Sequence, residues 1–462
     1  MLILEKPVSR VDSHGSALRE SRHALLTSKM EVAQSVKNCL SNSLTLSAYL
    51  RDTSNEKEDS MSHLSQELQA SGIARVIVFL KQERAAEGPA KLQHLFSSSE
   101  LSQASALGSE STRKGKAYSP MTFYPHLGIL YGTADRHGVA LLRAQKNLVA
   151  GLCGAPPLSI IRPTHVAAAT LKTKVTWGLQ ELGAPDLWDE GYTGKGVLVG
   201  HLDTGVDGKH PALKKAIAEF AEFDMLGREV TPTPKPHDTD EHGTHTAATI
   251  AGRAVGGKTV GMAPGAMLAS AIVIEGGDVV ARVLGGMDWA VGKGVKILSM
   301  SLGFRGWWQD FLPLTKLLRA RNVLPIFAVG NEGPGTSRSP GNYWQACSIG
   351  AADRGREIAD FSSSQRFKRK KDPVVPDIVA PGVDIVSAKP GGGYQTMDGT
   401  SMATPHVAGL AALLWEAKPL ATVNQIEQAI FRSCRRGPNM DLERGNRGIP
   451  NGPRALTLLR NS

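Results

Sequence analysis

The chain has 462 residues, of which 41% are hydrophobic and 21% are charged, and its formal net charge is +10. This is the composition of a folded globular protein, and no run of about 18 apolar residues indicates a membrane protein. At roughly 100–200 residues per domain, the length predicts two or three folded units. The basic cluster Lys368–Lys371 has no interleaved aromatic residues, so it indicates a solvated loop and no nucleic-acid partner.

The N-terminus and the cysteines bear on localisation. Only Met1–Leu4 are apolar before charge and proline follow, whereas a secretory signal needs an apolar core of about 7–15 residues. The four cysteines are scattered and form no C-x-x-C pair, which excludes a disulfide framework and a zinc ribbon. We therefore expect a cytoplasmic protein at synthesis, with signal-independent secretion as the open alternative.

The first 163 residues fall into two parts. Residues 1–72 are rich in Ser, Lys, Glu and Arg with few apolar clusters, which predicts a flexible N-terminal arm. The residues after them predict a small α+β unit, followed by an Ala-rich linker at 164–173. The elements expected in this unit are strands at 74–80, 127–131 and 159–162 and a helix at 135–150.

The remainder of the chain alternates apolar strands with helical segments. Such alternation predicts a mostly parallel sheet with helices on both faces, a three-layer α/β domain. The expected elements are strands at 197–202, 266–274, 295–300 and 323–329 and a helix at 278–291.

Polar residues follow three of these strands directly. They are Asp203, Ser301 and Asn331. Because functional sites of open parallel sheets lie at the carboxyl ends of the strands, these side chains are expected to meet at one edge.

Two further segments place reactive residues at the start of apolar helices. His242 lies in Asp240-Glu-His-Gly-Thr-His, and Ser401 lies in Gly399-Thr-Ser-Met-Ala-Thr-Pro-His. A helix N-terminus presents unpaired N–H groups and a partial positive charge. A serine there can attack a carbonyl while its own N–H faces the developing oxyanion.

Together, the segments L-D-T-G, H-G-T-H, G-N-E-G and G-T-S-M-A-T-P-H-V-A-G resemble the signature blocks of the subtilisin-like serine proteases, in that family's order. The resemblance covers about residues 177–459. It implies that Ser401 is the nucleophile, His242 the general base, and Asp203 the residue that orients the histidine. The Asn331 amide and the Ser401 N–H would form the oxyanion hole. By the same resemblance, an extended peptide would bind along Ser301, Leu302, Gly303, Ala328 and Gly330.

The resemblance also implies a domain organisation. Residues 73–172 would be a ferredoxin-like inhibitory propeptide domain with its cleavage linker, and residues 173–462 the catalytic domain. The tail Thr164–Thr173 is expected to lie in the groove and to contain the cleavage point. The implied protein is a self-processing zymogen, a monomer whose partners are a protein or peptide substrate and its own propeptide.

Departures from the family pattern concern metal and specificity. The stretch Arg253–Gly261 offers Lys258 and no carboxylate where many family members carry a calcium loop, so a structural calcium ion is in doubt and no cofactor is expected. Arg338 stands near the expected floor of the specificity pocket and would narrow it or favour acidic residues. Asp240 and Glu241 would tune His242, favour basic substrate residues, or only complement the helix dipole.

Other interpretations remain open. A single D-T-G also occurs in aspartic proteases, but that class has no use for His242 or Ser401. His242 and His245 could bind a metal, although no third ligand follows at zinc spacing. A silent binding module of this fold and a peptide ligase using the same acyl-enzyme are the alternatives to a serine endopeptidase.

Overall fold

The computed structural model describes residues 63–97, 120–155 and 157–462. The expected flexible arm at 1–72 lies outside these ranges except for its end, where helix α3 (His63–Ser71) buries Leu64. No helix within the described ranges combines the length and apolar character needed to span a bilayer.

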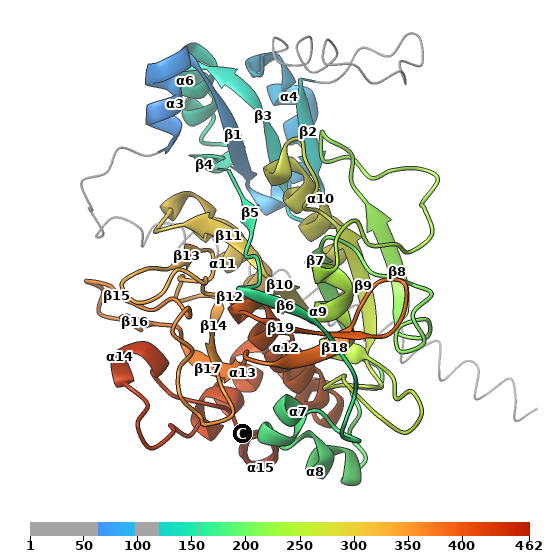
Figure 1. The fold of residues 1–462 in the computed structure, drawn as a ribbon. Coiled ribbons are helices and arrows are strands. Elements are labelled where there is room, and N and C mark those ends of the chain that lie inside the picture. The colour runs from blue at the N-terminus through green and yellow to red at the C-terminus, as the bar shows by residue number, and fades with distance from the viewer. Residues whose placement is uncertain (1–62, 98–119, 156) are drawn as a thin grey trace, which may run out of the picture. The chain divides into compact units, whose positions relative to one another are not determined.

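The predicted small α+β unit contains a four-stranded antiparallel sheet (Figure 1). Its strand order is β2 (Met121–Tyr124), β3 (Ile129–Asp135), β1 (Ile73–Leu80) and β4 (Val149–Gly154). Helices α3 and α6 (Arg136–Ala144) flank it, with one turn of α4 (Gly88–Leu92). The β-branched run of β1 explains its central place, since nearly all its side chains are buried.

Two boundaries in this unit differ from the prediction. The helix expected at 135–150 ends at Ala144, and the apolar residues after it form β4, which pairs with β1. The strand expected at 159–162 is present as β5 (Ser159–Ile160), but it does not belong to the small sheet. It pairs instead with β11 (Leu302–Arg305) of the following domain.

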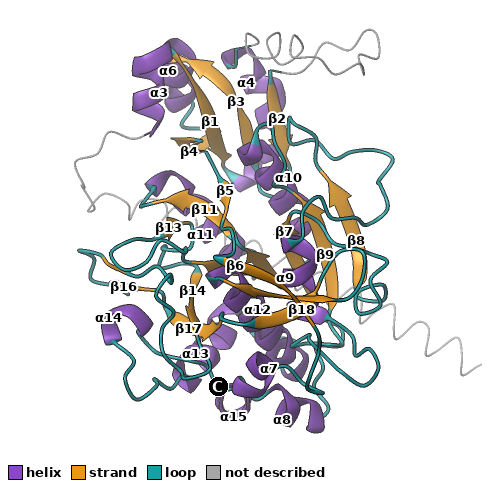
Figure 2. Ribbon diagram, viewed as in Figure 1, coloured by secondary structure: helices purple, strands orange, loops and turns teal. Residues whose placement is uncertain are grey.

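The larger domain contains the predicted parallel sheet, with seven strands (Figure 2). Their order is β17 (Ile378–Pro381), β14 (Cys347–Ala352), β12 (Leu324–Ala328), β10 (Ile297–Met300), β7 (Leu198–Asp203), β9 (Met267–Ile272) and β8 (Ile217–Glu222). All neighbouring pairs are parallel. The central strands are buried on both faces, which explains their continuous apolar sequence.

Helices cover the sheet and complete the three-layer α/β architecture. Helix α12 (Thr400–Ala417) packs against α9 (His242–Ala251) and five strands of this sheet, and every residue from Thr400 to Trp415 is buried. Small residues permit this close approach, since a Cβ on Gly409 would lie 2.4 Å from the Met262 side chain. Helix α10 (Val279–Gly292) packs on β7 and β9, and helix α11 (Leu312–Ala320) packs on β12.

The remaining helices lie near the two ends of the larger domain's sequence. They are α7 (Trp177–Glu181), α8 (Ala184–Asp189), α13 (Val423–Ser433), α14 (Leu442–Gly445) and α15 (Gly452–Arg460). Helix α15 packs against both α8 and α13, so the two ends of this domain meet.

The small sheet is joined to the larger domain through helix α10. The hydroxyl of Tyr124 donates to the Ala281 carbonyl at 2.9 Å, and the backbone N–H of Leu127 donates to Asp288 Oδ1 at 2.7 Å. Tyr131 donates to Asp278, which also caps α10. Polar groups of the small unit thus contact both the start and the body of this helix.

The chain leaves the small unit as two short strands that contact the larger domain. After β5, strand β6 (His165–Ala169) pairs with β19 (Tyr394–Asp398), which in turn pairs with β18 (Ile385–Ala388). The stretch expected to be a linker at 164–173 is therefore partly a strand. Between β5 and β6 lie Ile161 to Thr164, and these residues cross the candidate site.

Candidate active site

Asp203 and His242 meet at the carboxyl edge of the sheet, as the sequence predicted. Asp203 is the last residue of β7, and His242 is the first residue of α9. Nδ1 of His242 lies 2.7 Å from Oδ1 of Asp203, and both side chains are almost fully buried. The Thr204 N–H donates to Oδ1 and the Thr246 hydroxyl to Oδ2, at 2.8 and 3.1 Å.

Burial and charge act in opposite directions on this pair. Burial alone would raise the pKa of Asp203, but the charge and hydrogen bond of His242 lower it below the usual value. Burial alone would lower the pKa of His242, but Asp203 raises it above the usual value. The pair therefore favours a carboxylate beside an imidazole that binds a proton readily.

Ser401 lies at the second position of α12, and its Oγ donates to the carbonyl oxygen of Ile161 at 2.7 Å. Nε2 of His242, the nitrogen not held by Asp203, is buried and has no hydrogen-bond partner among the described residues. No hydrogen bond between Ser401 and His242 is present in this arrangement. The serine hydroxyl is directed at a peptide carbonyl, and the histidine retains a free position.

Asn331 lies on the other side of Ser401, beyond the end of β12. Its Nδ2 donates to the carbonyl oxygen of Arg162 at 2.9 Å. Its Oδ1 accepts hydrogen bonds from both the N–H and the hydroxyl of Thr400, each at 2.9 Å. These two contacts fix the amide so that its N–H groups face the chain that crosses the site.

The predicted substrate segment at 301–303 holds β5 in an antiparallel pairing. Leu302 pairs with Ile160 and Gly303 with Ser159, and the Ile161 N–H donates to the Ser301 carbonyl at 3.0 Å. This is the docking geometry of an extended peptide on a strand edge.

The other predicted substrate residues, Ala328 and Gly330, make no hydrogen bond to 159–162 within the described structure. Ala328 pairs with Ile349 in the sheet. Gly330 has φ +120°, a conformation that favours glycine, and its carbonyl accepts from Ser363 and Thr400. In this arrangement the hydrogen bonds of these residues are made within the larger domain, around the Asn331 turn.

Arg338 lies beside the groove but is already neutralised. Its guanidinium contacts Glu332, with Nε 2.9 Å from Oε1, and Nη1 donates to the Ser159 hydroxyl at 3.0 Å. Burial alone would raise the pKa of Glu332, but the hydrogen bond from Arg338 lowers it. The arginine therefore contacts the bound strand at Ser159, and its charge is paired with a carboxylate.

Sequence reasoning missed the hydroxyls that support the site. Thr246 follows His242 by one helical turn, a spacing that places both on one face of α9 and could have indicated the contact to Asp203. Thr400 directly precedes the serine and orients Asn331, which no sequence pattern indicated. His201 was missed as well: its Nε2 lies 2.8 Å from the Thr246 hydroxyl and 3.7 Å from Asp203.

His245 and His406 make structural contacts. His245 Nε2 lies 2.9 Å from the Ile385 carbonyl, and burial lowers its pKa to about 3. Nδ1 of His406 lies 2.8 Å from the Met402 carbonyl, and burial lowers its pKa to about 4. No group of three or more His, Cys, Asp or Glu side chains in the described ranges is placed to hold a metal ion.

The loop Arg253–Gly261 does not fit a calcium ion. Val255 and Lys258 pair in a tight turn through Gly256 and Gly257, and the Lys258 ammonium donates to the Leu171 carbonyl. Calcium needs several oxygen ligands, including carboxylates in its protein sites. The Lys258 ammonium already places a positive charge in this loop, and that charge would repel a calcium ion.

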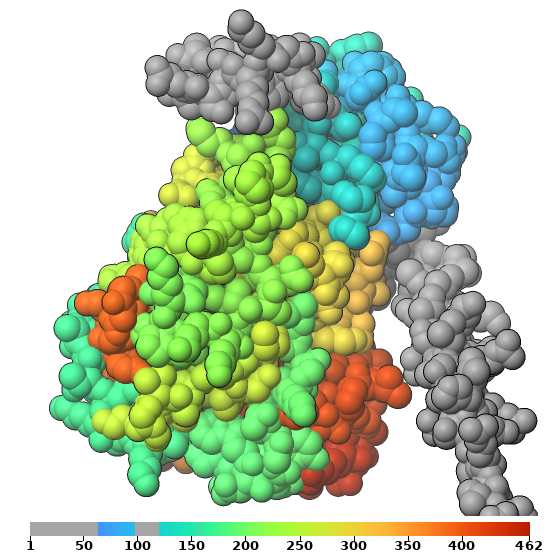
Figure 3. Space-filling model, turned by 90° about the vertical axis from the view of Figure 1, so that its right-hand side faces the viewer, coloured from blue at the N-terminus to red at the C-terminus, as the bar shows by residue number. Residues whose placement is uncertain are grey.

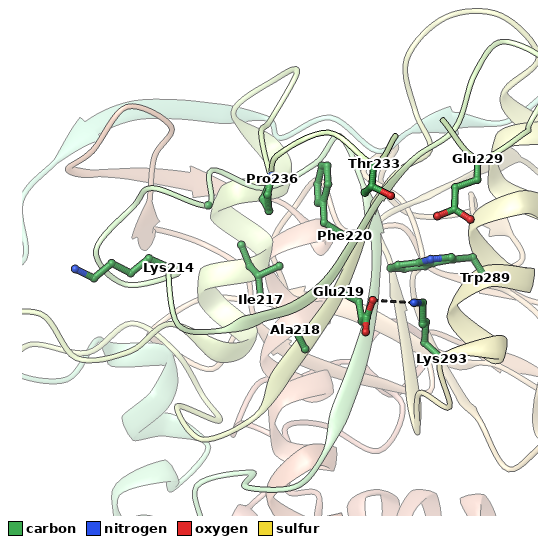
Figure 4. Close-up of a pocket in the computed structure, with 11 residues that line it drawn as sticks. Lys214, Ile217, Ala218, Glu219, Phe220, Glu229, Thr233, Pro236, Trp289 and Lys293 are labelled. Carbon is green, nitrogen blue, oxygen red and sulfur yellow. Dashed lines mark hydrogen bonds and ion pairs between the residues drawn. The ribbon is translucent and has the colours of Figure 1, made fainter. Parts of the chain in front are cut away.

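The open cavity of the larger domain lies elsewhere, along the outer strand β8. It has a volume of about 530 Å³ and is lined by residues including Ile217, Phe220 and Trp289, with Glu219 and Lys293 paired at 2.8 Å (Figure 4). Residues around 200–260, in green tones, form much of the face shown in Figure 3. None of the predicted catalytic residues lines this cavity, and the candidate site itself is occupied by the chain's own residues 161 and 162.

Comparison with known proteins connects this geometry to a family. The Subtilase family profile matches residues 194–448. The chain is 36% identical over 266 residues to M-protease of Shouchella clausii (57% of this chain, 65% of that protein). It is 36% identical over 247 residues to Subtilisin Savinase of Lederbergia lenta (53% and 86%) and 32% identical over 281 residues to Subtilisin E of Bacillus subtilis (60% and 70%). The match spans just under two thirds of M-protease.

Proposed function

The chain belongs to the subtilase family, and we propose that it is a serine endopeptidase made as a self-processing zymogen. The observation that supports this most directly is the contact of Ser401 Oγ with a peptide carbonyl of the chain itself, at 2.7 Å. The buried Asp203–His242 pair lies beside it, and Asn331 donates to the next carbonyl along the crossing chain.

The bond we expect to be cut is Ile161–Arg162. Two carbonyls contact the site, those of Ile161 and Arg162, and only the first touches the nucleophile. This proposal places the cut upstream of the segment 164–173 in which the sequence predicted it, and it is supported by the hydrogen bond from Thr164 to Asp398 and the pairing of β6 with β19. A two-residue strand carries too little pattern for sequence to place it against its partner.

In the proposed reaction, the Ser401 hydroxyl turns toward the free Nε2 of His242, which takes its proton. Oγ attacks the carbonyl carbon of Ile161, and the Asn331 amide moves its hydrogen bond from the Arg162 carbonyl to the new oxyanion, which the Ser401 N–H also stabilises. His242 then gives the proton to the Arg162 nitrogen as the carbon–nitrogen bond breaks. Water hydrolyses the resulting ester on Ser401, with His242 again accepting and returning a proton.

Intact mass analysis of the purified full chain tests this proposal. We expect two products, residues 1–161 and 162–462, while Ser401→Ala remains at full length and Ser462→Ala, at the exposed C-terminus, is processed like the wild type. Removing such a nucleophile lowers turnover by about 10⁶-fold in this family. Equal processing of Ser401→Ala would disprove self-cleavage, and a new N-terminus at Pro163 would move the cut to the next bond.

A fluorophosphonate probe separates the alternative functions. Labelling that depends on Ser401 is expected of an active enzyme and not of a silent binding module. Peptide products are then analysed by mass, because a ligase would join an added amine to the acyl group where a protease adds water.

A further inference from the structure

The side chain of Arg162 makes an ion pair beside the reacting residues. Its Nη1 lies 2.8 Å from Oδ2 of Asp240, two residues before His242. The backbone carbonyl of the same residue accepts from Asn331. One residue of the crossing chain is therefore held on both sides of the site, by its main chain at Asn331 and by its charge at Asp240.

Asp240 is held by hydrogen bonds to residues of its own domain as well as by Arg162. Its Oδ1 accepts from the Glu241 N–H at 2.6 Å, and its own N–H donates to Asp238 Oδ1 at 3.2 Å. The carboxylate side chain is 26% exposed, whereas the Arg162 side chain is 68% exposed. The less exposed partner thus belongs to the larger domain, which also holds it by hydrogen bonds, and the more exposed partner belongs to the bound strand.

Arg162 is the main cation that offsets this carboxylate, and the nearby His242 contributes to a smaller extent. Within the described ranges, Arg162 is the ion-pair partner of Asp240. Burial alone would raise the pKa of Asp240, but the hydrogen bond from Arg162 lowers it. Without the arginine, a partly buried negative charge would remain near Asp203 and Asp238, which also carry carboxylates.

The opposite end of the bound strand has a different electrostatic character. There Arg338 is balanced by Glu332, and the strand offers only the Ser159 hydroxyl. The groove is therefore charge-neutral beside Ser159 and negative beside Arg162. Of these two positions, the second is the one at which a positively charged substrate residue gains a favourable electrostatic interaction.

We propose that Asp240 is a specificity-determining residue that selects Lys or Arg in substrates at the position occupied by Arg162. This proposal rests on the proposed protease function and defines its substrate class as chains with a basic residue directly beside the cleaved bond. This substrate position is the residue whose backbone carbonyl accepts a hydrogen bond from the Asn331 side chain, as that of Arg162 does here.

Self-processing of the full chain gives the first test. Arg162→Gln and Asp240→Asn are each expected to slow processing roughly two- to fivefold, the range of a partly exposed ion pair. The double variant should be no slower than either single one, because both remove the same interaction. Arg162→Glu should be slower still, and combination with Asp240→Arg should restore part of the rate.

Peptides added to the processed protein separate substrate selection from simple retention of the chain's own strand. The probe has the sequence of residues 157–166, and its matched partner carries citrulline, the neutral analogue of arginine, at position 162. Wild type should prefer the arginine peptide roughly two- to fivefold in kcat/KM at low salt, less at high salt. The ratio should approach one in Asp240→Asn and stay unchanged in Glu241→Gln, whose carboxylate is exposed and lies outside the proposed site.

The ratio of the two peptides is the decisive quantity. Asp240 also contributes to the raised pKa of His242, and this effect changes both peptides equally and cancels. An arginine preference that persists unchanged in Asp240→Asn, or charge-swap variants that show no recovery, would overturn the proposal. Loss of all cleavage and of Ser401 labelling in the wild type would instead count against the protease function.

Discussion

The groups on the two sides of Ser401 differ in kind, since one side is ionisable and the other is neutral. On one side, Asp203 and His242 form a buried ionisable pair whose pKa values move in opposite directions. On the other side, Asn331 and Thr400 form neutral hydrogen bonds that orient an amide without any titrating group. The first side, the acid–base side, can move a proton, while the second, the amide side, can only stabilise a charge that forms. Substitutions on the two sides should therefore differ in pH dependence as well as in size.

The largest effect in this comparison is expected from Asp203→Asn. The asparagine cannot stabilise the imidazolium, so the rate of self-processing should fall by about 10⁴-fold. In the wild type, the rate should rise with pH through a pKa above 6.5, because only neutral His242 accepts the serine proton and Asp203 raises its pKa. In the variant, histidine NMR titration should show the His242 pKa shifted downward. An unchanged His242 pKa would contradict the proposed coupling.

Asn331→Leu should have a smaller effect of another kind. Leucine has a similar shape but donates no hydrogen bond, and loss of the equivalent donor costs about 10²–10³ in turnover. Because the amide does not titrate, the pH profile of kcat/KM should keep the wild-type midpoint. A shifted midpoint would show that the two sides of the site are not independent.

Thr400→Val should have the smallest effect. The variant removes the hydroxyl contact to Asn331 but keeps the backbone contact from the same residue, so the amide loses one of two restraints. A neutral hydrogen bond contributes about 0.5–1.5 kcal/mol, so kcat should fall roughly two- to tenfold with little change in KM. Thr400→Ser, which retains the hydroxyl, is the matched control. A loss as large in the serine variant would point to packing and not to the hydrogen bond.

Sequence predicted the acid–base side more completely than the amide side. A carboxylate at a strand end and a histidine at a helix start follow from local pattern, and the parallel sheet brings them together. The Thr400 contact depends on how α12 meets the turn after β12, two elements distant in sequence. The position of β5 is of the same kind, because its two residues pair with β11 only through the fold of the whole domain.

The pairing of β5 in the groove has a kinetic consequence. While the chain is intact, residues 159–162 compete with any substrate as a tethered ligand, whose effective concentration can reach the millimolar range. After a cut at Ile161–Arg162, residues 159–161 belong to a separate fragment, and their occupancy of the groove depends on total protein concentration. Under this proposal, dilution activates the processed protein. The same molecules would be inhibited at high protein concentration and active at low concentration, where the cleaved fragment dissociates.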